Sequence, residues 1–165
     1  MSLKKNYKGY QSFQYLEKDR DYKYFELADE IDRVSSNRVE LNTEQEELVT
    51  KILTDHVLIS VHEHLGTFPK DINQTPAYIK EGRMATAFEG LSRSHWDCVF
   101  DNLMNGVCQI HSKGGWKWSE VIHDLGMRLC DIAHQDFVIH CKTVEDIRRA
   151  HREGKVAWVA VMEGA

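Results

Sequence analysis

The pattern with the clearest chemical capacity in this sequence is His62-Glu63-His64, which directly follows the apolar run at residues 57–61. Side chains two positions apart project to the same side of a strand, so both imidazoles can reach one ion. Neutral imidazole nitrogens are ligands of zinc and similar divalent metals. The pattern therefore predicts a metal site at the C-terminal end of a strand over 57–62. The alternative is a pair of strand histidines that only make hydrogen bonds. Glu63 points to the opposite side and is interpreted as structural.

A second apolar run, at residues 156–162, leads directly to Glu163 and Gly164. A carboxylate at the C-terminal end of a neighbouring strand could bridge two metal ions about 3.5–4 Å apart, the arrangement that serves hydrolysis. Gly164 would let the backbone pass close to such a site. Glu163 is therefore predicted to be the third metal ligand, beside His62 and His64.

A rival pair with metal-ligand chemistry is His134 and Asp136, near the end of a helix that is predicted to start at Ser119. Side chains diverge where a helix ends, and a histidine at a helix C-terminus is explained by its interaction with the helix dipole. The pair is therefore interpreted as structural.

The elements that must position these residues can be predicted from periodicity and capping signals. Helices are expected at 24–35 and at 43–55, the second with a Thr43–Glu46 capping box. Further helices are expected to begin at Thr75-Pro76 and at Ser119. A last helix is expected at 144–152, after Thr143 and before Gly154. Strands are expected at 57–62, 107–110, 137–139 and from 155 onward. Strands that alternate with helices predict an α/β fold with a parallel sheet.

Composition excludes several classes of protein. The formal net charge of −5 gives no reason to expect nucleic acid or an anionic membrane as a partner. No apolar stretch approaches the ~20 residues that span a bilayer, and the N-terminus lacks a secretory signal, so a cytoplasmic location is expected. Residues 1–40, rich in tyrosine and phenylalanine, are predicted to form an extension whose aromatic side chains anchor it to a main body at 41–165.

Three stretches resemble the membrane dipeptidase (renal dipeptidase-like) family of peptidases in the amidohydrolase superfamily. They are LISVHEH at 58–64 with TFP at 67–69, TVEDI at 143–147, and GKVA at 154–157 leading to MEGA at 162–165. The last is the most specific, since a Gly-Lys, apolar, Glu-Gly strand is typical of that family. The resemblance covers roughly 41–165, and residues 1–40 look like an extension found in one bacterial subgroup.

The resemblance implies the N-terminal portion of a metal-dependent (β/α)8 (TIM-type) barrel with an N-terminal helical extension. It implies two zinc ions, of which His62 and His64 hold the first and Glu163 bridges both, and cleavage of dipeptides or related small amides by metal-activated water. Position 64 is aspartate in the common family pattern, so His64 raises the net charge of the site by one and leaves the metal preference open. The family's remaining metal ligands and its catalytic aspartate are expected beyond Ala165.

Two other interpretations stay open. Lactonases and phosphotriesterase-like enzymes also carry a His-x-His strand, often written HEHL as at 62–65, but they commonly bridge their metals with a modified lysine, so Glu163 favours the dipeptidase branch. A (β/α)8 barrel typically needs ~250 residues, so further polypeptide or another chain is expected to complete it. The non-enzyme interpretation is a truncated barrel segment that serves as a subunit or interaction module, and assembly of identical copies is compatible with it.

Overall fold

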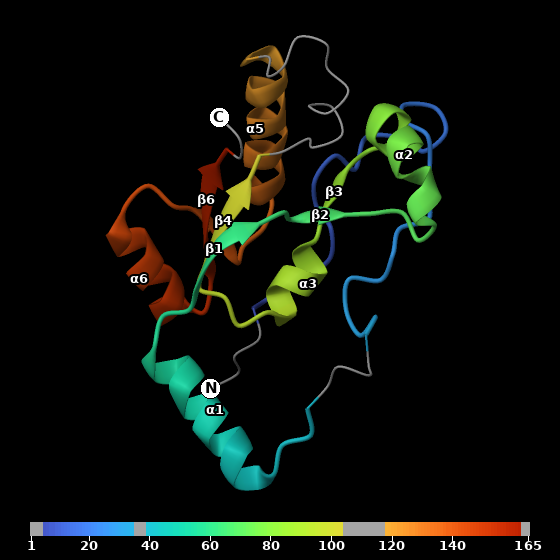
Figure 1. Ribbon diagram of the computed structural model, residues 1–165. Coiled ribbons are helices and arrows are strands. Elements are labelled where there is room, and N and C mark those ends of the chain that lie inside the picture. Colours follow the sequence, from blue (N-terminus) through green and yellow to red (C-terminus); the bar gives the residue numbers. More distant parts are fainter. Residues whose placement is uncertain (1–4, 35–38, 104–117, 163–165) are drawn as a thin grey trace.

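The computed structural model describes residues 5–34, 39–103 and 118–162 (Figure 1). The helices are α1 (Thr43–Asp55), the 3-10 turn η2 (Ile72–Gln74), α2 (Thr75–Glu81), α3 (Phe88–Arg93), α5 (Trp118–Ala133) and α6 (Val144–Glu153). The strands are β1 (Ile59–Glu63), β2 (Gly66–Thr67), β3 (Ala85–Thr86), β4 (Cys98–Asn102), β5 (Val138–His140) and β6 (Val156–Val161).

Four strands form one parallel sheet in the order β1-β4-β6-β5, and β2 pairs with β3 in a separate antiparallel ribbon. The predicted α/β class with a parallel sheet is therefore confirmed. β6 lies between β4 and β5, although it is the last of the three along the chain. β1 and β5 form the two edges of the sheet in the part of the chain that the structure describes, and this sheet is open rather than closed into a barrel.

Helices cover both faces of this sheet. Alternate strand residues divide between two hydrophobic clusters, as the pleat of a strand requires. Val99, Val156 and Trp158 belong to the cluster against which Leu125 and Leu129 of α5 pack. Cys98 and Ala157 belong to the cluster that contains Ala150 of α6. The centre of the molecule is therefore a layered arrangement with α5 and α6 on opposite sides of the sheet (Figure 1).

The unit formed by α6 and β6 follows from local signals in the sequence. Thr143 and Asp146 form the predicted capping box at the start of α6. Gly154 ends the helix in the left-handed conformation, with φ 65°, which glycine adopts at little cost. The first three residues of β6 are fully buried. This unit therefore forms the centre of the core.

The unit formed by α1 and β1 has its predicted position but is largely exposed. α1 begins at Thr43 and ends at Asp55 as predicted, but its capping box joins Asn42 to Gln45 rather than Thr43 to Glu46. None of the residues of α1 is buried. β1 is also largely exposed, with 73% of Val61 accessible to solvent. The apolar run before His62 therefore does not form a buried strand, because β1 lies at the edge of the sheet.

The predicted helix at 24–35, and with it the helical extension, is wrong for the described residues 24–34, none of which is helical. Their backbone groups bond to other segments instead: the Ala28 amide donates to the Phe68 carbonyl, and the Lys70 amide donates to the Glu26 carbonyl. Asp32 has a φ of 59°, which breaks a right-handed helix. Tertiary hydrogen bonds therefore replace the helical ones that the apolar periodicity suggested.

The aromatic residues of the N-terminal segment do anchor it to the body, as predicted. Tyr7 packs edge-on against Phe137, and Tyr10 packs against Phe88. Phe25 is buried beside Tyr78 of α2. The segment thus covers the side of the core that faces α3.

The second strand of the described parallel sheet along the chain is β4. β4 occupies 98–102, whereas the predicted strand at 107–110 falls outside the described residues. The helices predicted from Thr75 and Ser119 are present, the second beginning one residue earlier, at Trp118. Among the residues that the structure describes, no helix has both the length and the apolar character that crossing a bilayer requires.

Candidate metal centre and its supporting network

His62 and His64 lie at the C-terminal end of β1. The pairing of β1 with β4 shifts register between Ser60 and Glu63, so β1 carries one extra residue there. Such bulges bend a strand and redirect its side chains, and they are frequent beside functional sites. Both imidazoles are exposed, and their rings meet at 83° with 3.3 Å between the two Nε2 atoms. The structure therefore brings the two predicted ligands together.

The separation of the two nitrogens matches the geometry of a shared zinc ion. Zinc binds histidine nitrogens at about 2.0–2.1 Å, so two ligands of one tetrahedral ion lie about 3.3–3.4 Å apart. The same 3.3 Å also allows one ring N–H to donate a hydrogen bond to the other ring. The donor set thus fits a zinc ion, and metal titration separates the two cases.

Glu163, the third predicted ligand, lies outside the described residues. The described part of β6 runs parallel to β1 with β4 between them, so the C-terminal ends of all three strands meet at one edge of the sheet. Within residues 5–34, 39–103 and 118–162, no cluster of three or more His, Cys, Asp or Glu side chains has the arrangement of a metal site. Glu163 as a metal ligand stays a prediction.

Glu63 has the structural role that was predicted for it. Its Oε1 atom accepts a hydrogen bond of 2.6 Å from the hydroxyl of Ser60. The bond spans the bulge in β1 and ties together the two residues between which the register shifts. Glu63 therefore holds the shape of the strand just before His64.

A buried charge cluster that sequence reasoning missed supports the end of β1. Asp101 of β4 is fully buried and lies in register with Glu63 of β1 and Ala160 of β6. Its Oδ2 atom accepts a hydrogen bond of 2.9 Å from the indole of Trp158 and lies 3.6 Å from Nε of Arg128 on α5. A buried carboxylate requires partners of this kind, because burial without them is costly.

Asp101 and Arg128 together hold the residue that follows His64. The amide of Leu65 donates to Oδ1 of Asp101 at 3.2 Å, and the carbonyl of Leu65 accepts from Arg128 at 3.2 Å. Both backbone groups of one buried residue are thus bound by one ion pair. This arrangement fixes the chain at the exit of the histidine pair. The signal in the sequence is an aspartate that directly follows the apolar run 98–100.

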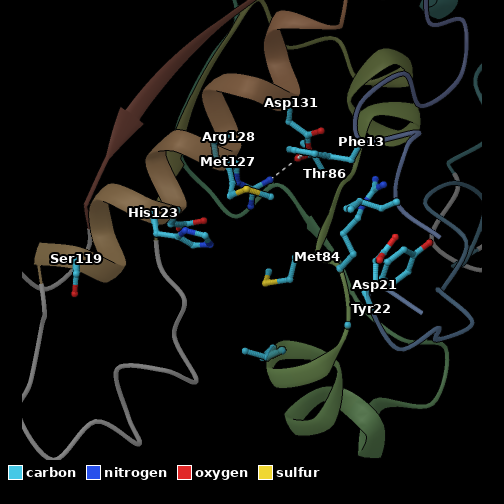
Figure 2. Close-up of a pocket in the computed structure, with 15 residues that line it drawn as sticks. Phe13, Asp21, Tyr22, Met84, Thr86, Ser119, His123, Met127, Arg128 and Asp131 are labelled. Atoms are coloured by element: carbon cyan, nitrogen blue, oxygen red, sulfur yellow. Dashed lines mark hydrogen bonds between the residues drawn. The ribbon is translucent and has the colours of Figure 1, made fainter. Parts of the chain in front are cut away.

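The cluster continues along α5 toward the N-terminal segment. Arg128 also donates to the hydroxyl of Thr86 at 2.6 Å, and that hydroxyl donates to Asp131 at 2.6 Å (Figure 2). The phenol of Tyr10 donates to the same carboxylate. Burial, followed by the charge of Asp131, raises the pKa of Tyr10 well above its usual value, so the phenol stays protonated. The network therefore links β4, α5, β3 and the N-terminal segment.

The rival pair His134 and Asp136 is engaged in structural contacts. Nδ1 of His134 lies 2.7 Å from the carbonyl of Cys130, one turn earlier in the chain. Asp136 forms an exposed ion pair with Lys8, 2.8 Å long, which holds the pKa of that carboxyl below its usual range. The structure gives each residue a separate partner, which agrees with the interpretation as structural residues.

Comparison with known proteins adds no identification. The chain matches no protein family, no curated protein and no solved structure at a significant level. The assignment of a function therefore depends on the site and the sequence pattern alone.

Proposed function

We propose that this chain is the N-terminal portion of a zinc-dependent, dipeptidase-type hydrolase of the (β/α)8 class, with His62 and His64 as ligands of the first of two metal ions. The observation that carries the proposal is the 3.3 Å separation of the two Nε2 atoms at the C-terminal end of β1. In parallel α/β folds, ligands and reacting groups gather at that edge of the sheet. The resemblance of 58–64 and 154–165 to the dipeptidase family supplies the substrate class.

In this proposal each residue has a defined task. His62 and His64 would hold the first ion, and Glu163 would be a further metal ligand. Asp101 and Arg128 bind the backbone of Leu65 and so fix the chain directly after His64. Neither of these two residues is itself a proposed metal ligand. When bound, the zinc ions would supply an activated water and polarise the amide carbonyl of the substrate.

Zinc binding by single-histidine variants tests the proposal. Zinc would be titrated into the purified chain against a chromophoric chelator, with His62→Ala, His64→Ala and, as the control, His95→Ala. His95 is exposed and distant in sequence from the pair. Loss of one ligand from a site of this kind is expected to weaken zinc binding by tenfold or more, whereas His95→Ala should bind as the unchanged protein does. Equal zinc affinity in all four proteins would contradict the assignment.

Activity distinguishes the dipeptidase from the lactonase interpretation. The zinc-loaded protein would be assayed with dipeptides and with lactones. Hydrolysis of dipeptides that is lost in His62→Ala supports the proposal. Hydrolysis of lactones alone would favour the phosphotriesterase-like branch.

One observation favours a non-enzyme function as a second candidate. A (β/α)8 barrel keeps its helices on the outside of the strands, whereas α5 and α6 pack on opposite faces of this sheet. The layered arrangement, together with the exposed α1 and β1, would suit a subunit or interaction module. A zinc-loaded chain that hydrolyses neither substrate class, and that elutes as an oligomer in size-exclusion chromatography with light scattering, would support this candidate.

A further inference from the structure

A cavity of about 710 Å³ lies between α5 and the N-terminal segment (Figure 2), and neither His62 nor His64 lines it. α5 forms one wall through Met127 and Arg128, and Phe13 and Tyr22 of the N-terminal segment form the facing wall. Met84, just before β3, lies between the two walls. Pockets for small molecules usually measure about 300–1,000 Å³. The cavity is therefore large enough for an organic ligand with a ring and a short chain.

Arg83 brings a positive charge to this cavity and is held there by aromatic rings. Its guanidinium carbon lies 4.6 Å from the ring centroid of Tyr10 and 5.4 Å from that of Phe13. Stacking of this kind fixes the plane of the guanidinium and leaves its N–H groups available at the edges. Within the described ranges, the Arg83 side chain lies over these two rings and forms no ion pair with a carboxylate.

The other charged groups of the cavity wall already have partners. Asp21 accepts hydrogen bonds from Arg20 and from the amide of Glu17. Asp131 accepts from Tyr10 and Thr86, and Arg128 lies beside Asp101. Burial raises the pKa of Asp124, so its neutral form is favoured relative to an exposed aspartate. Of the two arginines that line the cavity, Arg128 pairs with Asp101, whereas Arg83 has no ion pair with a described carboxylate.

We propose that this cavity binds a small organic carboxylate with an apolar body, whose carboxylate group is held by the guanidinium of Arg83. A planar guanidinium matches a carboxylate through two parallel hydrogen bonds, which gives orientation as well as affinity. The apolar body would contact Met84, Met127 and Phe13, since thioethers adapt to rings of different shape. Neither histidine of the pair lines this cavity, and the proposal does not depend on the proposed hydrolase function.

Three ligands of matched shape test the proposal. 4-Phenylbutyrate, 4-phenylbutan-1-ol and 4-phenylbutylamine share a ring and chain but carry a negative, a neutral and a positive group. Their dissociation constants would be measured by isothermal titration calorimetry with the unchanged chain, with Arg83→Gln, and with Arg93→Gln as the control. Arg93 ends α3 on an exposed surface and does not line the cavity.

The unchanged chain is expected to bind 4-phenylbutyrate at least tenfold more tightly than the alcohol, and the alcohol more tightly than the amine. Arg83→Gln should remove the preference for the carboxylate, and Arg93→Gln should retain it. In case Arg83→Gln fails to fold, as judged by circular dichroism, Met127→Glu places a negative charge on the opposite wall and should weaken binding of the carboxylate relative to the alcohol. Equal binding of the three ligands, tightest binding of the amine, or no binding at all would overturn the proposal.

Discussion

Two units of this molecule are built from the same local signals but differ in how deeply they are buried. α1 with β1, and α6 with β6, are each a helix with a capping box followed by a parallel strand. Val156, Ala157 and Trp158 of β6 are fully buried, whereas Val61 of β1 is 73% exposed and α1 contributes no buried residue. β6 has a strand on each side, and β1 lies at an edge. Local sequence thus determines that an element forms, and its place in the sheet determines how much it contributes to stability.

The largest expected difference between the two units is the stability that each strand provides. Trp158→Ala removes a fully buried indole and its hydrogen bond to Asp101, and it should lower the free energy of unfolding by about 3–5 kcal/mol. Val61→Ala, on the exposed edge, should change it by no more than about 0.5 kcal/mol. Urea denaturation followed by circular dichroism measures both. A loss of similar size in the two variants would mean that β1 is as deeply packed as β6 in solution.

A smaller difference is expected at the two helix caps. Thr143→Ala removes the cap of α6 and should lower the free energy of global unfolding by about 1 kcal/mol. Asn42→Ala removes the equivalent cap of α1 and should reduce the helicity of α1 with little effect on global unfolding, because no residue of α1 is buried. The comparison requires urea denaturation monitored by tryptophan fluorescence, with amide hydrogen exchange for α1. Equal losses of global stability would show that α1 unfolds together with the core.

The smallest expected difference is in pH dependence. The cap of α6 includes the carboxylate of Asp146, whereas the cap of α1 joins two neutral amides. The amide of Lys142 and the Thr143 side chain, which donate to Asp146, hold the pKa of that carboxyl below its usual range. A lowered carboxyl pKa stabilises the folded state above about pH 4 and ceases to do so as pH falls through the lowered value.

Asp146→Asn should therefore shift the urea midpoint downward at pH 7, and the shift should shrink as the pH falls below about 4. Gln45→Ala in the cap of α1 serves as the control, and its effect on the midpoint should stay constant over the same range. The measurement is urea denaturation at a series of pH values. If the shift of the urea midpoint for Asp146→Asn persists at the lowest pH, then Asp146 stabilises the cap through its shape rather than through its charge.

The parts of the fold that could be predicted are those whose cause is local. The boundaries of α1 follow from its apolar spacing, and the end of α6 follows from Gly154. The parts that could not be predicted depend on partners distant in the chain. Residues 24–34 have helical spacing, but their backbone bonds to residues near Phe68 decide their conformation. The order of the strands is likewise a property of the assembled sheet.

The candidate site divides in the same way. His62 and His64 are two residues apart, so their proximity could be predicted from the geometry of a strand, and the structure confirms it. The support of the site could not, because Asp101 and Arg128 meet only when α5 packs beside β4. The sequence around each residue contains no pattern that predicts this ion pair. The contact of Arg83 with two aromatic rings could not be predicted either, because Tyr10 and Phe13 lie about 70 residues earlier in the chain.

The central position of β6 has a consequence for the order in which the molecule folds. β5 pairs only with β6 among the described strands, and β4 has only β1 as a partner until β6 is present. During synthesis, the cluster around Trp158 therefore cannot assemble before residue 161 has emerged. Until then the apolar faces of the earlier helices stay exposed to solvent. Sheets whose contacts span long stretches of chain fold slowly and are exposed to misassembly in the interval. For the described sheet, the rate-limiting event of folding is expected to be the insertion of β6 between β4 and β5.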